Sequence, residues 1–142
     1  MSTRFRLPAL ALLLWAASHV PSFAEGAVAL GLPANVANDG VAIGHSDSHD
    51  TREGAERSAM DLCRREEQGG TKGLCKIVLN FRNQCVAVAV DPLFGTAGFG
   101  WAVADTRQAA SERALTLCRD SSTPERRNAC KIDGGGCDGT AK

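Results

Sequence analysis

The sequence has little of the material from which small proteins usually build a core. It contains no tyrosine, two tryptophans and five phenylalanines in 142 residues. Three of these aromatic residues fall within positions 1–24. Alanine and valine occupy many of the remaining apolar positions, and each such small side chain removes little area from water when buried. We therefore expect the fold to need stabilisation beyond its hydrophobic core.

An excess of charge of either sign is also missing. The chain carries 16 basic and 16 acidic residues, and without positions 1–24 two more acidic than basic residues would remain. A near-neutral chain has no electrostatic footprint for nucleic acid or for anionic lipid. We therefore expect neither nucleic acid nor a membrane surface as a partner.

Long hydrophobic runs are absent as well. The apolar stretch LPALALLLWAASHV is shorter than the roughly 20 apolar residues that span a bilayer. It follows two arginines and leads to Ser22-Phe23-Ala24, which places small residues before a cleavage site. We interpret residues 1–24 as a cleaved signal peptide and residues 25–142 as a single exported domain, periplasmic or secreted.

Cysteine is the residue type that compensates for the weak core. All six cysteines lie in the exported part, and an even number in an exported chain favours disulfides. No Cys-x-x-Cys pair occurs, and the spacings do not match those of zinc-binding knuckles. The sequence therefore predicts three disulfides.

Two segments of the chain repeat each other. DTREGAERSAMDLCR (50–64) and DTRQAASERALTLCR (105–119) are identical at eight of fifteen positions, with a constant offset of 55. The same offset carries Cys75-Lys76-Ile77 onto Cys130-Lys131-Ile132, and a small shift relates Cys85 to Cys137. This register indicates an internal duplication with three cysteines in each copy.

Each copy has the pattern of a β-β-α-β unit. Alanine, leucine and cysteine recur at helical spacing in both repeated segments, and Asp50 and Asp105 are expected to be their N-caps. We expect a flexible glycine run before Cys137. The prediction is one α+β domain with halves of about 26–82 and 83–138 and two helices, at 50–64 and 105–119. Its six short strands are expected at 26–30, 40–44, 76–81, 85–90, 98–104 and 131–133.

Symmetry between the copies ranks the cysteine pairings. Equivalent copies should form equivalent bridges, which favours Cys63–Cys75 and Cys118–Cys130 within the halves and Cys85–Cys137 between them. A loop-entropy estimate gives about 3 kcal/mol for each short bridge and about 4 kcal/mol for the long one. Spacing alone leaves swapped pairings open.

The features that recur in the two copies resemble a known family. They are the alanine-rich helices ending in cysteine, the two Cys-Lys-Ile segments, Phe81-x-Asn83-x-Cys85 and Gly100-Trp101. Together they resemble the domain of unknown function 4189, a family of small exported bacterial proteins, over roughly 26–137. The resemblance implies a duplicated, cysteine-containing fold and leaves activity unassigned. This chain departs from the family pattern at Gly44-His45, where an aromatic residue is expected after the glycine.

GHSDSHD (44–50) is the one polar cluster that invites a chemical interpretation. His45, His49 and Asp47 are candidate ligands of a weak metal site. The same histidines with Ser46 or Ser48 could serve a small periplasmic hydrolase, although no Gly-x-Ser-x-Gly motif is present. We favour a structural interpretation, in which a strand end runs into a helix cap.

The aromatic residues Trp101, Phe99 and Phe94 form the candidate binding surface. Tryptophan is enriched at binding hot spots, but it is also the largest side chain available to this core. Since no catalytic constellation is evident, we expect a non-enzymatic binding module without a cofactor. Its expected partner is a protein, in the manner of an inhibitor, immunity factor or effector.

Overall fold

The structure is a computed structural model that describes residues 24–142; the predicted signal peptide lies outside the described residues except for Ala24. Strands β1 to β3 and helix α2 come first in the chain, and β4 to β6 with α3 follow. The bounds are β1 Glu25–Gly31, α1 Val36–Asp39, β2 Ala42–His49, α2 Arg52–Glu66, β3 Lys76–Phe81, β4 Cys85–Val90, β5 Phe99–Ala104, α3 Arg107–Ser121 and β6 Lys131–Cys137.

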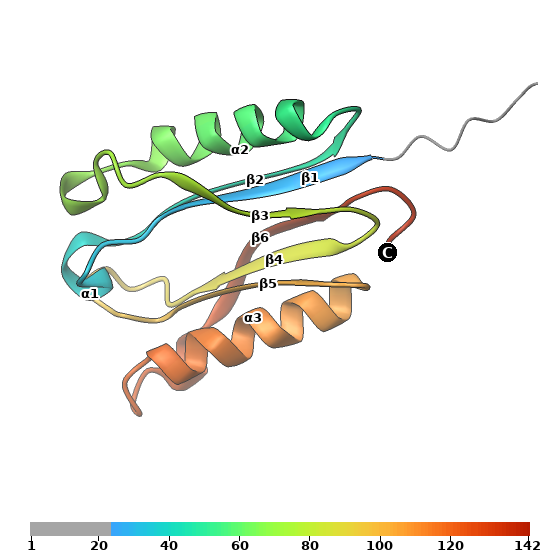
Figure 1. The fold of residues 1–142 in the computed structure, drawn as a ribbon. Helices are drawn as coiled ribbons and strands as arrows, with labels where there is room; N and C mark the ends of the chain where they lie inside the picture. Colours follow the sequence, from blue (N-terminus) through green and yellow to red (C-terminus); the bar gives the residue numbers. More distant parts are fainter. Residues whose placement is uncertain (1–23) are drawn as a thin grey trace, which may run out of the picture.

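Two small sheets lie face to face, and each is covered by a helix on its outer side (Figure 1). The first sheet has the order β2-β1-β3, and the second has the equivalent order β5-β4-β6. All strand pairs are antiparallel. Helix α2 packs on the first sheet and α3 on the second, which gives four layers. The α+β class, the six strands and the two long helices are confirmed, and the one-turn helix α1 is an addition.

The alternation of alanine and valine along the central strands decides which layer each face meets. Ala27 and Ala29 of β1 pack under α2, while Val28 points to the second sheet. In β4, Ala87 packs under α3, and Val86 joins Val28 between the sheets. Because successive strand residues point to opposite faces, a small-large alternation produces a close helix contact on one side and a sheet-sheet core on the other.

A glycine in each edge strand allows the helix to approach closely. A Cβ on Gly44 would overlap the carbonyl of Ala59 in α2, and a Cβ on Gly100 would overlap the carbonyl of Ala114 in α3. The next residue in each strand, His45 or Trp101, then points away from the helix. The Gly-aromatic pattern therefore combines helix packing with an inward-facing side chain.

The local boundaries differ from the prediction at three places. The N-caps are Thr51 and Thr106, because their hydroxyl oxygens accept the N–H of the third helical residue at 3.1 Å. Strand β2 continues through His49, so the GHSDSHD segment is itself part of a sheet. The glycine run before Cys137 belongs to β6, where Gly134 and its neighbours pair with β4. The expected flexible approach is therefore wrong.

The predicted disulfides Cys63–Cys75, Cys118–Cys130 and Cys85–Cys137 are all present. The expectation that Cys85–Cys137 joins the two halves is wrong, because Cys85 begins β4 and Cys137 ends the neighbouring β6. The second unit therefore holds four of the six cysteines, and Cys85 is not a third cysteine of the first copy.

An ion pair stands in the first sheet where the second has its additional disulfide. By register, Glu25 at the start of β1 corresponds to Cys85, and Arg82 after β3 corresponds to Cys137. The Arg82 guanidinium donates to the Glu25 carboxylate. The two copies thus close the same end of their sheets by different chemistry.

A buried carboxylate that follows β6 binds both the first unit and the turn between the two units. Asp138 is fully buried, and its two oxygens accept the backbone N–H groups of Ser48, at 3.1 Å, and Asn83, at 3.2 Å. These two are the non-glycine residues with positive φ in the described chain, at 61° and 51°. Ser48 is also the additional residue of β2 relative to β5. Asp138 therefore stabilises a bulge and a turn that would otherwise be strained.

Candidate functional site

The duplication places one cleft at the outer edge of each sheet. The first lies along β2, between α2 and β6, and the second lies along β5, between α3 and β3. Three pairs of equivalent positions line both clefts: His45 and Trp101, Leu62 and Leu117, and Gly134 and Leu79. We call them the His45 cleft and the Trp101 cleft.

The Trp101 cleft is an apolar groove of about 560 Å³. Trp101 is partly buried, because one side packs into the core between the sheets while the other lines the groove. Leu117 of α3 and Leu79 of β3 form the flanks and remain 48% and 37% exposed. Glu112 and Arg113 add one charge of each sign at the α3 side. Contiguous exposed apolar patches mark interaction sites, and tryptophan is enriched at binding hot spots.

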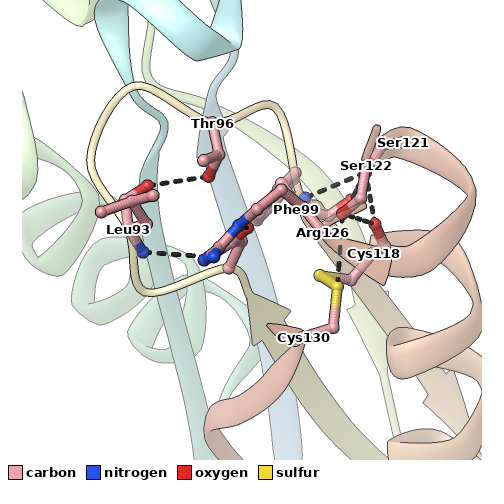
Figure 2. The surroundings of a disulfide bond; sticks show 9 residues. Leu93, Thr96, Phe99, Cys118, Ser121, Ser122, Arg126 and Cys130 are labelled. Carbon is pink, nitrogen blue, oxygen red and sulfur yellow. Dashed lines mark hydrogen bonds and ion pairs between the residues drawn. A yellow bond between two sulfur atoms is a disulfide. The ribbon is translucent and has the colours of Figure 1, made fainter. Parts of the chain in front are cut away.

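The backbone of β5 is open along this groove. Among the described strands β5 pairs only with β4. The Ser121 hydroxyl donates to the Phe99 carbonyl and accepts the Phe99 N–H, both at 2.9 Å (Figure 2), so these groups point away from β4. Because outward groups alternate along an antiparallel edge, the N–H and C=O of Trp101 and Val103 point outward as well.

The turn between β4 and β5 is held firmly but lies outside this groove. The guanidinium of Arg126 donates to both oxygens of Asp91 at 2.5 and 2.8 Å, and this contact lowers the pKa of Asp91 to about 2. Asp91 also accepts the N–H of Leu93. Phe94 at the tip is 89% exposed, whereas Phe99 packs between the sheets. The structure therefore does not gather Phe94, Phe99 and Trp101 into one surface.

The His45 cleft is more polar, and it reaches deeper into the fold. It has a volume of about 500 Å³ and extends past β6 to Val88 and Val90 of β4. Glu66 and Asp133 line it together with the imidazole of His45. Burial lowers the pKa of His45, and the nearby Asp47 carboxylate opposes that shift. The Nδ1 atom of His45 is buried without a hydrogen-bond partner among the described residues.

Of the other members of GHSDSHD, Asp47 lies near His45 and faces β6 beside Gly136, whereas Ser46 and His49 do not converge with His45. The Ser46 hydroxyl donates to the Ala55 carbonyl of α2 at 2.7 Å, and His49 lies beside Gly54 at the start of that helix. His45 faces β6 instead, near Gly134. In residues 24–142 no group of three or more histidine, cysteine, aspartate or glutamate side chains is placed to hold a metal ion. Ser48 donates its hydroxyl to Asp47.

Sequence reasoning found one member of each cleft and missed the flanks. Trp101 and His45 stand out because each follows a glycine that occurs in both copies, and His45 replaces the aromatic residue. Leu79, Asp133 and Gly134 come from strands of the opposite unit. The offset of 55 aligns 79 with 134 and so signals their equivalence, but only the stacking of the sheets brings them to the clefts.

The disulfides and the helices bear on the compartment of the protein, and comparison with known proteins bears on its family. Three disulfides are typical of an oxidising, extracellular environment. None of the helices between residues 24 and 142 has the length and apolar character needed to traverse a bilayer. No curated protein and no solved structure matches the chain. Residues 26–137 match the family described as domain of unknown function (DUF4189), and the chain belongs to that family.

Proposed function

We propose that this protein is a non-enzymatic exported binding module that holds an extended segment of a protein partner in the Trp101 cleft. The observation that carries the proposal is the coincidence of an apolar groove with an open strand edge. Trp101 and Val103 line the groove with their side chains and present outward backbone groups. A partner strand added to β5 would gain main-chain hydrogen bonds and bury apolar side chains together.

The groove suits one strand with apolar side chains on one face. Leu79 and Leu117 stand on opposite flanks, so a side chain lying over Trp101 would contact both. Ser121 already occupies the outward groups of Phe99, which would end the added strand at that point. The groups of Trp101 and Val103 remain for pairing, and this limits the recognised segment to a few residues.

Export is part of the proposal. It is supported by the signal-peptide pattern of residues 1–24 and by the disulfides that use all six cysteines. N-terminal sequencing of the protein from the envelope and the medium of its producing organism tests it. We expect the mature chain to begin at Glu25, and an intact N-terminus in the cytosol would contradict export.

Site-specific photocrosslinking tests the binding role. A photoreactive residue at Thr116, which is exposed in the groove, should crosslink to a protein partner in the producing organism. The matched control is the equivalent position, Asp61 on α2, which is also exposed. Leu117→Asp should abolish the Thr116 crosslink, whereas the equivalent Leu62→Asp should leave it intact. Equal crosslinking from both positions would refute the assignment of this groove.

A further inference from the structure

The two copies differ systematically at the positions that line the His45 cleft. Register and offset relate four of its residues to counterparts in the other copy. His45 corresponds to Trp101 and Gly134 to Leu79. Glu66 corresponds to Ser121 and Asp133 to Val78. Each of these differences either gives the His45 cleft a more polar side chain or removes a side chain from its wall.

Space comes mainly from Gly134. At the position equivalent to Leu79 of β3, strand β6 has a glycine. Because that position has no side chain, the cleft opens onto Val88 and Val90 of β4. A volume of about 500 Å³ lies in the range of pockets that hold small organic molecules. The floor is apolar, since it consists of valines from the layer between the sheets.

Charge in this cleft has one sign. The carboxylates of Glu66 and Asp133 are both exposed at its rim. Among the described residues that line it, none is lysine or arginine. Burial favours the neutral form of the His45 imidazole, so the ring adds hydrogen-bonding capacity without positive charge. An apolar floor beneath two carboxylates is complementary to a molecule with an apolar body and a cationic group.

We propose that the His45 cleft binds a small organic amine, with its apolar body on Val88 and Val90 and its ammonium group at the carboxylates of Glu66 and Asp133. The ammonium is the preferred cation here, because its N–H groups form charge-assisted hydrogen bonds to carboxylates. This site is separate from the Trp101 cleft and does not depend on the function proposed for it.

Phenethylamine is the probe, with phenylethanol and phenylacetate as neutral and anionic analogues of similar size. Backbone amide NMR shifts of the oxidised mature protein report where each molecule binds. We expect saturable shifts at His45, Leu62 and Gly134 with the amine only, and weaker binding at high salt. Equal binding of amine and anion, or no saturable shift at millimolar amine, would overturn the proposal.

Three variants separate charge from shape. Glu66→Gln combined with Asp133→Asn should weaken amine binding about tenfold or more, because hydrogen bonds to charged groups are strong. Gly134→Leu restores the side chain of the duplicate and should block the cleft. A Cβ at that position would lie 3.3 Å from Nε2 of His45, so a small adjustment admits it. If Gly134→Leu disturbs folding, the carboxylate variant alone decides.

Controls distinguish this proposal from the function proposed above. Glu112→Gln removes a carboxylate from the Trp101 cleft and should leave amine binding unchanged. Leu117→Asp should abolish partner crosslinking at Thr116 and also leave amine binding unchanged. Loss of amine binding in Glu112→Gln would show that the amine occupies the wrong cleft and would refute the assignment.

Discussion

Replacing Asp138 by alanine should destabilise the protein more than any exposed substitution. The side chain is fully buried and accepts the N–H groups of Ser48 and Asn83 at 3.1 and 3.2 Å. Both donors belong to residues with positive φ, so these hydrogen bonds compensate backbone conformations that L-residues otherwise avoid. Asp138→Ala would remove the acceptor of both N–H groups.

The expected cost follows from the two lost bonds. A hydrogen bond to a charged acceptor contributes about 1.5–3 kcal/mol, and the variant would lose two of them; because both donor residues are exposed, water replaces part of that loss. Removal of the carboxylate also removes the desolvation cost of a buried charge. We therefore expect the free energy of unfolding to fall by about 2–4 kcal/mol. Asp138→Asn keeps one acceptor oxygen and should cost about half as much.

Guanidinium denaturation of the oxidised mature protein measures this loss. Asp120→Ala, which removes an exposed carboxylate at the end of α3, is the matched control and should change stability by less than about 0.5 kcal/mol. Ser48→Gly in the Asp138→Ala background should recover roughly 0.5–1 kcal/mol, because glycine adopts positive φ without a Cβ clash. If Asp138→Ala behaves like Asp120→Ala, the assigned role of the carboxylate is refuted.

Three further changes test packing, electrostatics and the duplication. Gly100→Ala should lower the free energy of unfolding by about 2–3 kcal/mol, because its methyl group would overlap a carbonyl of α3; an unchanged melting temperature would contradict this. Hydrogen bonds from Arg126 lower the pKa of Asp91 from 3.8 to about 2, so their stabilisation is complete above 3.8 and is lost as the pH falls toward 2. Asp91→Asn should flatten that part of the pH profile of the denaturation midpoint, and an unchanged slope would argue against the ion pair. Glu25→Cys with Arg82→Cys should form an additional disulfide at the position equivalent to Cys85–Cys137, as mass spectrometry of alkylated protein would show; free thiols in the folded variant would oppose that equivalence.

Much of the fold could be predicted because its signals are local. The repeat at offset 55 identifies both long helices, and short runs rich in valine or isoleucine between glycines indicate the strands. The cysteine pairs Cys63–Cys75 and Cys118–Cys130 follow from the repeat, since each joins equivalent segments. These signals can be read from the sequence because helical and strand periods are only a few residues long.

The assignment of Cys85 to the first copy failed for a physical reason. A cysteine that follows β3 by a few residues is close in sequence to the first unit, yet a strand pairs by register and not by proximity in the chain. Cys85 begins β4 and lies opposite Cys137, while the first sheet uses Glu25 and Arg82 at the same end. Only the register of two complete sheets shows that an ion pair and a disulfide occupy equivalent places.

From the sequence alone the two units could be predicted, with their duplication, their helices and most of their strands, and the disulfide pairings could be ranked with swapped pairings left open. Tertiary structure alone decided the clefts, because each takes one wall from its own helix and another from a strand of the opposite unit. Gly134 and Leu79 acquire their opposite effects on cleft depth only when β6 faces β2 and β3 faces β5. Burial and charge in the clefts depend on how the two sheets stack. The periodicity of residues within one helix or strand carries no information about that stacking.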